Sequence, residues 1–195
     1  VTLGNTGTNA NIVFHATQTG NDQFTHIKWN EVGKSISING ASIDSGHSLT
    51  FDGSHVTEYG AFNIVGGHGN DTLTGSASAV DSDSNPIGDT ISGGEGDDTI
   101  NGLAGNDTLS GDCDNDTIHG GDGNDMVKGG HGNDMLYGDA GTDSLSYANE
   151  GGSQGIVVNV AAGTTTDTYG TTDTTEGFEN AIGSSYNDTI LLNQA

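Results

Sequence analysis

A nine-residue repeat occupies the middle of the chain and limits what the sequence can fold into. From Gly66 the sequence reads GGHGNDTLT, and units of the form G-G-x-G-x-D-x-U-x, with U a large aliphatic residue, recur in phase as far as Ser146. Residues 66–146 divide into nine such units, and eight of them keep both the sixth-place Asp and the eighth-place aliphatic residue. A period of nine fits neither the 3.6-residue helical turn nor a heptad, so a helical array is excluded.

Each unit suits a turn followed by a short strand. Glycines in the first half permit positive φ angles and close backbone approach, and the last three residues can form a strand with one side chain pointing inward. A single unit buries only one aliphatic side chain and cannot be stable alone. Coils stacked about 4.8 Å apart would align these side chains and pair their backbones. The repeat therefore predicts an all-β solenoid.

The charge of the chain sets a second constraint. The 195 residues include 27 Asp and Glu but only 3 Lys and Arg, which gives a formal net charge of −24. This balance excludes a nucleic-acid-binding protein, because phosphate contacts need clustered Lys and Arg. No apolar run approaches the roughly 18 residues that a membrane span requires, so we expect none.

Stacking would bring sixth-place carboxylates of neighbouring coils together, and like charges at such range disfavour ionisation of both. A hard divalent cation with six to eight oxygen ligands suits Asp carboxylates and loop carbonyls, whereas a softer metal would favour His or Cys. The sequence therefore predicts Ca²⁺ in preference to Mg²⁺. The predicted ligands are the carboxylates of Asp71, Asp89, Asp98, Asp107, Asp116, Asp125, Asp134 and Asp143 and the backbone carbonyls of Gly67, Gly69, Gly94, Gly96, Gly105, Gly121, Gly123, Gly130, Gly132 and Gly141.

The run from Gly66 to Ser146 resembles the RTX (repeats-in-toxin, haemolysin-type) calcium-binding repeat of proteins exported by bacterial type I secretion. The resemblance implies a right-handed parallel β-roll, or β-helix solenoid, in which two units make one coil and calcium lies in the nonapeptide turns. It implies ions between successive loops of one edge, about six in all. The implied pairs are Asp71–Asp89, Asp89–Asp107, Asp107–Asp125 and Asp125–Asp143 on one edge, and Asp98–Asp116 and Asp116–Asp134 on the other.

The array divides the chain into three parts. Residues 1–65 alternate polar and apolar side chains, as at 35–39 and 48–52, and predict irregular β-helix-like lead-in coils. Residues 147–195 predict a strand segment that caps or continues the roll, with Asp188 and Ile190 in the sixth and eighth places of a partial unit. Because the sequence begins at Val1 with neither Met nor a signal peptide, we expect a piece of a longer polypeptide.

Several residues depart from the consensus. The unit 75–83 has Val80 in place of the sixth-place acid, and we expect the loop 84–89 to be the weakest site. His68 and His131 share the third place seven units apart, which predicts opposite edges. Cys113 also occupies this variable place and is expected to be an exposed, unreactive residue.

These features predict a calcium-binding structural module of a secreted or cell-surface bacterial protein. It would fold on meeting extracellular calcium, aid type I export and stiffen its parent, an adhesin, a surface-layer protein or an exported enzyme. The expected partners are calcium, the type I secretion machinery and, through self-association or adhesion, another copy or a cell-surface glycan. A carbohydrate-binding or adhesive module is the alternative. A polysaccharide-modifying enzyme is disfavoured, because the sequence has no H-E-x-x-H motif, no Ser-His-Asp context and no Arg.

Overall fold

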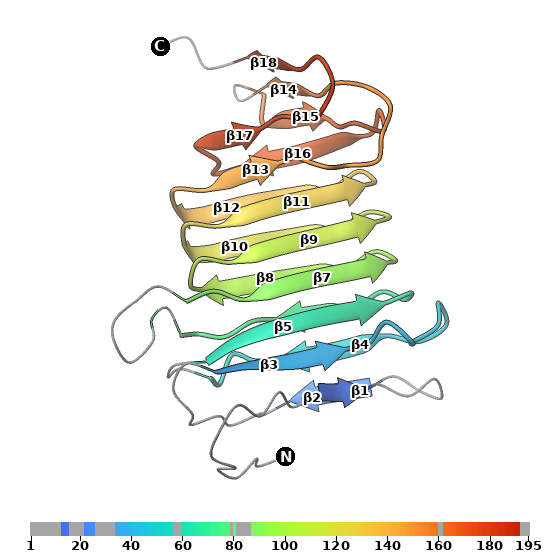
Figure 1. Cartoon of the computed structure of the whole chain (residues 1–195), viewed down its shortest axis with the longest axis vertical. Coiled ribbons are helices and arrows are strands. Elements are labelled where there is room, and N and C mark those ends of the chain that lie inside the picture. Colours follow the sequence, from blue (N-terminus) through green and yellow to red (C-terminus); the bar gives the residue numbers. More distant parts are fainter. Residues whose placement is uncertain are drawn as a thin grey trace.

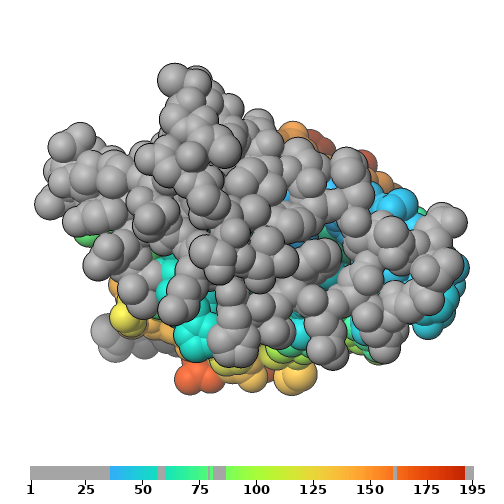
Figure 2. All heavy atoms as spheres, turned by 90° about the horizontal axis from the view of Figure 1, so that it is seen from below, coloured from blue at the N-terminus to red at the C-terminus, as the bar shows by residue number. Residues whose placement is uncertain are grey.

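The computed structural model is an all-β roll built from two stacked sheets (Figure 1). Coils follow one another along a single axis, and the end-on view shows early coils in blue overlapping later coils in yellow to red (Figure 2). No helix in the part of the chain described is long and apolar enough to cross a membrane. The structure describes residues 13–15, 22–25, 34–56, 60–78, 80, 87–159 and 162–191.

Strands alternate between the two sheets along most of the chain. The first sheet has eight strands, in the order β1 (Val13–His15), β3 (Lys34–Asn39), β5 (Gly60–Gly67), β7 (Thr90–Glu95), β9 (Thr108–Cys113), β11 (Met126–His131), β13 (Ser144–Ser146) and β17 (Asn180–Ile182). The second has ten, in the order β18 (Thr189–Leu191), β14 (Val157–Asn159), β15 (Thr164–Thr166), β16 (Thr172–Glu176), β12 (Met135–Gly141), β10 (Thr117–Gly123), β8 (Thr99–Ala104), β6 (Thr72–Thr74), β4 (Leu49–Asp52) and β2 (Asp22–Thr25). The predicted parallel β-roll is confirmed.

The eighth-place aliphatic residues form the core between the sheets. In the first sheet Ile91 pairs with Leu109 in parallel register, and in the second Ile100 pairs with Ile118, so each coil places like residues over like. Every one of these side chains is at most 2% exposed, and each such burial contributes roughly 1.5–3 kcal/mol. The ladder consists of Leu73, Ile91, Ile100, Leu109, Ile118, Val127, Leu136 and Leu145.

The stretch between β6 and β7 breaks the regular spacing. Equivalent residues of successive half-coils, such as Thr90 and Thr99, are nine positions apart, but the first residues of β6 and β7 are 18 apart. A Cβ atom built on Gly75 would lie 2.2 Å from Asp89 Oδ2, the same relation that Gly93 has to Asp98. Gly75 and Asp89 are thus the first and sixth places of one half-coil with nine extra residues. The prediction that 75–83 and 84–92 form two units is wrong.

Deleting residues 78–86 is therefore expected to leave the roll intact. The deletion joins Ala77 to Ile87, restores a nine-residue unit with Asp89 in the sixth place, and keeps the hydrogen bond from the Ala77 N–H to the Val56 carbonyl. Because a shorter connection between β6 and β7 costs less closure entropy, the melting temperature in calcium should stay within about 2 °C of wild type or rise. Deleting nine residues of the regular array, 104–112, removes one half-coil with the core residue Leu109 and the ladder residue Asp107, and should lower the melting temperature clearly. Equal damage from both deletions would refute this assignment.

The flanking segments continue the two sheets. The stretch 35–39 lies within β3, residues 49–52 form β4, and β5 pairs directly with β7. On the C-terminal side β14 and β15 pair antiparallel. Ile156 donates its N–H to Asp188 Oδ1 at 3.0 Å, and β18 pairs parallel with β14, so the last partial unit does form a half-coil.

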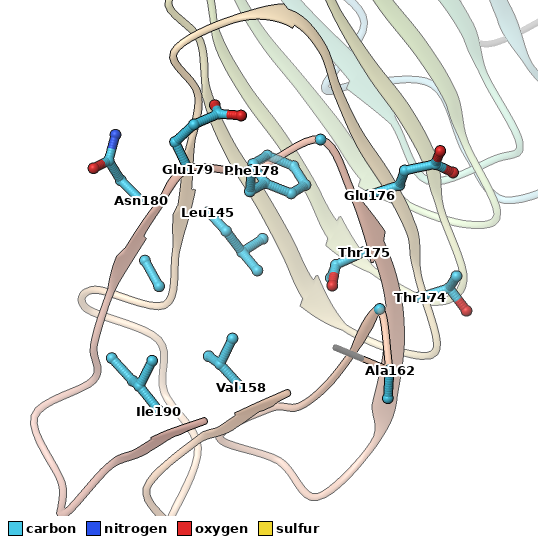
Figure 3. Close-up of a pocket in the computed structure, with 13 residues that line it drawn as sticks. Leu145, Val158, Ala162, Thr174, Thr175, Glu176, Phe178, Glu179, Asn180 and Ile190 are labelled. Atoms are coloured by element: carbon cyan, nitrogen blue, oxygen red, sulfur yellow. The ribbon is translucent and has the colours of Figure 1, made fainter. Parts of the chain in front are cut away.

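An open pocket of about 780 Å³ lies where the core ladder ends (Figure 3). Leu145, the last aliphatic residue of the array, faces Val158, Phe178 and Ile190 across it (Figure 3). Ile190 occupies the eighth place of the terminal half-coil and is 43% exposed. The pocket is thus the uncovered end of the core.

Candidate calcium-binding edges

The sixth-place aspartates form a hydrogen-bonded ladder along each edge of the roll. Along one edge the N–H of Asp98 donates to Asp116 Oδ1 at 2.8 Å, and the N–H of Asp116 donates to Asp134 Oδ1 at 2.9 Å. We call this row of loops, 66–71, 93–98, 111–116 and 129–134, the Asp98 edge. The Asp107 edge carries the same bonds among Asp89, Asp107, Asp125 and Asp143, at 2.6 to 2.8 Å.

Asp71 lies on the Asp98 edge. Its N–H donates to Asp98 Oδ1 at 2.7 Å, across 27 residues instead of 18. The implied pairing of Asp71 with Asp89 is therefore wrong, because the nine extra residues before β7 change which edge the later loops join. The other five implied pairs are neighbours as expected.

Seven of the eight sixth-place carboxylates keep one oxygen buried without a hydrogen-bond partner. These atoms are the Oδ2 of Asp71, Asp98, Asp107, Asp116, Asp125, Asp134 and Asp143. Asp89, in the loop expected to be the weakest site, differs because its Oδ2 accepts the Ser76 N–H at 2.6 Å. A buried ionised oxygen without a partner is costly, so these atoms need a cation or a proton.

Burial raises the pKa of these carboxyl groups. The pKa of Asp116 rises to about 9, first through burial and then through the charges of Asp98 and Asp134 on either side. For the others the pKa rises to about 6 at Asp71, Asp89, Asp125 and Asp134 and to about 7 at Asp98 and Asp107. The folded edge therefore binds either protons or a counter-cation near neutral pH.

The turns are shaped by left-handed residues in the second and fourth places. Twelve such residues, from Gly94 to Gly141, have φ between 64° and 156°. Four of them are not glycine, namely Leu103, Asp112, Asp114 and Asp139, so the departures from the consensus keep the turn despite the strain. Gly67 and Gly69 of the first unit lie outside this region, so its loop has a different shape.

Backbone carbonyls face the gaps between successive loops. A Cβ atom built on Gly121 would lie 2.1 Å from the carbonyl oxygen of Leu103, and one on Gly123 would lie 1.5 Å from that of Gly105. Glycine in the later loop therefore allows the two loops to approach this closely, because a side chain there would clash with the carbonyl. The close approach places carbonyl oxygens of one loop against the next loop, and carbonyl oxygens are among the six to eight oxygen ligands that Ca²⁺ takes.

Calcium fits this donor set better than a metal held by side chains alone. Among the described residues no group of three or more His, Cys, Asp or Glu side chains converges on one point, so carbonyl oxygens have to complete any shell. Carbonyls and carboxylates are ligands of hard cations. The Asp98 and Asp107 edges would hold Ca²⁺ through their sixth-place carboxylates and second- and fourth-place carbonyls, and the ion would neutralise the buried charge.

Two sets of edge residues were missed by the sequence reasoning. Fifth-place residues form outer ladders, since the N–H of Asn133 donates to Asn115 Oδ1 and the N–H of Asn124 to Asn106 Oδ1, both at 2.9 Å. The recurrence of Asn in this place was the available signal. Beyond the array, Asp134 donates its N–H to Asp173 Oδ1 at 3.2 Å, and Asp143 donates to Glu179 Oε2 at 2.8 Å.

The third-place residues form an exposed row on the Asp98 edge. His68 Nδ1 lies 3.0 Å from Glu95 Oε2, and Glu95, Cys113 and His131 are register neighbours in β7, β9 and β11. The expectation that His68 and His131 lie on opposite edges is wrong for the same reason as the Asp71 pairing. Cys113 is exposed. Partial burial of its thiol and the charges of nearby acids raise the pKa of the thiol, which disfavours the reactive thiolate.

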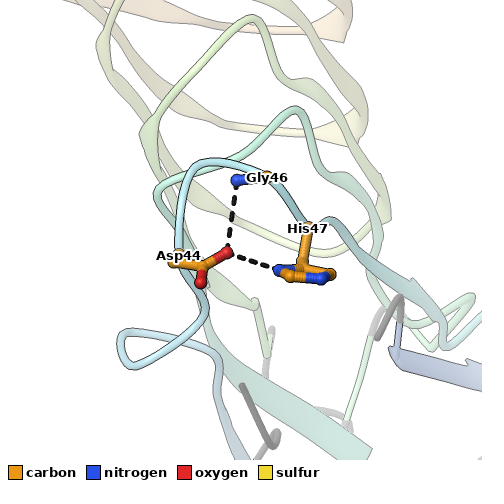
Figure 4. A network of polar contacts seen from close by, with 3 residues as sticks. All are labelled: Asp44, Gly46 and His47. Atoms are coloured by element: carbon orange, nitrogen blue, oxygen red, sulfur yellow. Dashed lines mark hydrogen bonds and ion pairs between the residues drawn. The ribbon is translucent and has the colours of Figure 1, made fainter. Parts of the chain in front are cut away.

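An exposed acid outside the ladders behaves differently. Asp44 accepts the Gly46 N–H at 3.2 Å and contacts the His47 imidazole (Figure 4). The hydrogen bond to His47 lowers the pKa of this carboxyl group. Asp44 therefore stays ionised without an added cation, in contrast to the buried sixth-place residues.

Comparison with known proteins identifies the array. A family model of the RTX calcium-binding nonapeptide repeat matches in four copies, at residues 63–79, 85–112 and 114–145. No curated protein and no solved structure matches the chain. The break between the first two matched ranges falls within the stretch that holds the nine extra residues. RTX repeats bind Ca²⁺, which agrees with the donor set of the two edges.

Proposed function

We propose, from the premise that the chain carries RTX calcium-binding nonapeptide repeats, that it is a calcium-folded structural module of a secreted or cell-surface bacterial protein. RTX repeats occur in proteins exported by type I secretion, which supports this location. The observation that carries the proposal is the row of buried Oδ2 atoms without partners on each edge. The proposal gives the segment a structural role and no catalytic one.

The charge balance makes folding depend on calcium. Without a cation, a chain of net charge −24 repels itself, and closing the roll would bury rows of carboxylates against each other. Each ion bound between two loops neutralises that charge and links adjacent coils, so ion binding and coil stacking are coupled. Extracellular calcium modules bind at about 10⁻⁴–10⁻³ M, far above cytosolic concentrations. The module would pass the type I exporter unfolded and then stiffen its parent outside the cell.

Circular dichroism during a calcium titration tests the proposal. Metal-stripped protein at pH 7.5 should lack β-structure, and a steep cooperative gain is expected between about 0.1 and 1 mM Ca²⁺. Magnesium at the same concentrations should have little effect, because it keeps its waters and its rigid octahedral geometry. A spectrum that is already folded without metal, or that responds equally to both ions, would exclude calcium-driven folding.

A further inference from the structure

A hidden half-coil follows the array on the Asp98 edge. Residues 168–176 read TYGTTDTTE, and Met135 of β12 pairs with Thr174 of β16 in the register that joins the regular coils. Thr172 donates its N–H to Asn133 Oδ1 at 3.2 Å, which continues the outer ladder, and Asp173 continues the inner one. The loop 168–173 therefore stacks on the loop 129–134 as one repeat loop stacks on the next.

Glu150 reaches this junction from the segment between β13 and β14. Its side chain is only 8% exposed, and Oε2 accepts the Thr168 hydroxyl at 2.9 Å. Ser153 donates its N–H to the Thr168 carbonyl at 2.9 Å, so the segment around Glu150 is fixed against the start of the loop. The other oxygen, Glu150 Oε1, is buried and has no hydrogen-bond partner.

The neighbouring acids differ in how well they are satisfied. Asp167 Oδ1 accepts the N–H groups of residues 169, 170 and 171, at 2.7 to 2.9 Å. Asp173 accepts the Tyr147 hydroxyl at 2.8 Å as well as the Asp134 N–H. Asp134 is 1% exposed and its Oδ2 has no partner. Glu150, which is bonded to Thr168 in one loop, and Asp134, in the adjacent stacked loop, thus each keep one buried carboxylate oxygen without a partner.

The junction carries more negative than positive charge. The Glu150 carboxylate is repelled by the charges of Asp134 and Asp167 and attracted by that of Lys128. His131 lies near Asp134 and favours its charged form. Among these groups the acids outnumber the lysine and the histidine. No three acidic, His or Cys side chains of the described residues converge on one point, so the free oxygens of Glu150 and Asp134, together with loop carbonyls, would be the ligands of a divalent cation here.

We propose that Glu150 and Asp134 bind a further Ca²⁺ between the loops 129–134 and 168–173, at the C-terminal end of the repeat array, and that this ion links the C-terminal segment to the roll. The inference rests on the proposed calcium-dependent function. It differs from a repeat site in taking one carboxylate from a segment that belongs to no repeat unit. The ion would link the last regular coil of the Asp98 edge, the hidden half-coil and the segment before β14.

Glu150→Gln tests the proposal with isothermal titration calorimetry. Gln keeps an oxygen to accept the Thr168 hydroxyl but removes the charge, so the variant should fold in calcium and bind one ion fewer than wild type. Glu176→Gln removes an exposed carboxylate from the neighbouring β16 and should bind the wild-type number. Thr168→Val removes the hydroxyl and leaves the carboxylate, so it should also keep every ion.

Hydrogen exchange supplies a readout of the fastening. In Glu150→Gln at saturating calcium, the amides of 169–171 should exchange at least about tenfold faster than in wild type, while those of β7 to β11 stay protected. An unchanged ion count in Glu150→Gln would overturn the inference while leaving the proposed function intact. Loss of an ion from Thr168→Val as well would overturn it too, because the loss would then reflect local unfolding. Absence of calcium binding by the wild-type protein would contradict both this inference and the proposed function.

Discussion

Replacing Asp116 by Asn is expected to remove about two bound ions and to raise the calcium concentration at the folding midpoint about threefold. Asp116 lies in the middle of the Asp98 edge, with a loop on each side, and its Oδ2 has no partner. Asn keeps the oxygen that accepts the Asp98 N–H but presents an NH₂ group to the cation. Losing a charged ligand at two sites costs about 3 kcal/mol of calcium-binding free energy. Because roughly four ions still bind on folding, this cost raises the calcium concentration at the folding midpoint about threefold.

Calcium titrations followed by circular dichroism and by calorimetry measure both effects, and Asp114→Asn is the matched control. Asp114 lies two residues away in the same loop and is exposed. Its φ of 74° is one that Asn adopts readily. The two variants change the net charge equally, but only Asp116 presents a buried free oxygen. Equal shifts in both would mean that net charge, and not the ladder position, controls calcium affinity.

The regular part of the fold was predictable because its two signals are independent and agree. The eighth place of each unit holds an aliphatic residue such as Ile118, which requires a core that recurs with each half-coil. The sixth place holds an acid such as Asp116, which requires a turn that recurs in the same way. Both are buried in the structure, at 0% and 1% exposure. Neither signal depends on long-range contacts, so a sequence read in isolation reveals them.

The assignment of loops to edges was less predictable because it depends on a count of half-coils. The unit 75–83 keeps the period, but Ser82 stands in its eighth place and Val80 in its sixth, and Val80 is 42% exposed. A polar eighth place cannot extend the core ladder, so this unit adds length without adding a half-coil. The polar Ser82 was the available signal. Counting 75–83 as a half-coil placed Asp71 and His68 on the wrong edge.

The hidden half-coil at 168–176 shows the opposite case. Asp173 is in the sixth place, but Thr175 is in the eighth and glycine is missing from the first two places. Nothing local distinguishes this stretch from a polar loop. Its turn is fixed by neighbours, since Thr174 pairs with Met135 and the Tyr147 hydroxyl donates to Asp173. Tertiary contacts of this kind, between residues far apart in sequence, are not encoded in a repeat pattern.

Metal-free protein is expected to gain β-structure as the pH falls from 7.5 to about 5. In the unfolded chain an Asp carboxyl group has a pKa of about 3.9. In the folded edges burial raises the pKa to about 6 for Asp125, about 7 for Asp107 and about 9 for Asp116. Between these values the folded state binds more protons, so the free energy of unfolding rises as the pH falls and is lost as the pH rises through about 6 to 9.

The pH titration, followed by circular dichroism in metal-stripped buffer, separates burial from net charge. Asp116→Asn removes the buried group with the highest pKa, so its metal-free transition should move to higher pH although the variant needs more calcium at pH 7.5. Asp114→Asn should leave the transition unchanged, because its carboxylate is exposed. Folding only below about pH 4, where exposed carboxylates also become protonated, would show that overall charge and not the ladders limits the metal-free state. Metal-free folding at a higher pH than wild type, together with a higher calcium requirement, in Asp116→Asn would show that protons and calcium neutralise the same buried oxygens.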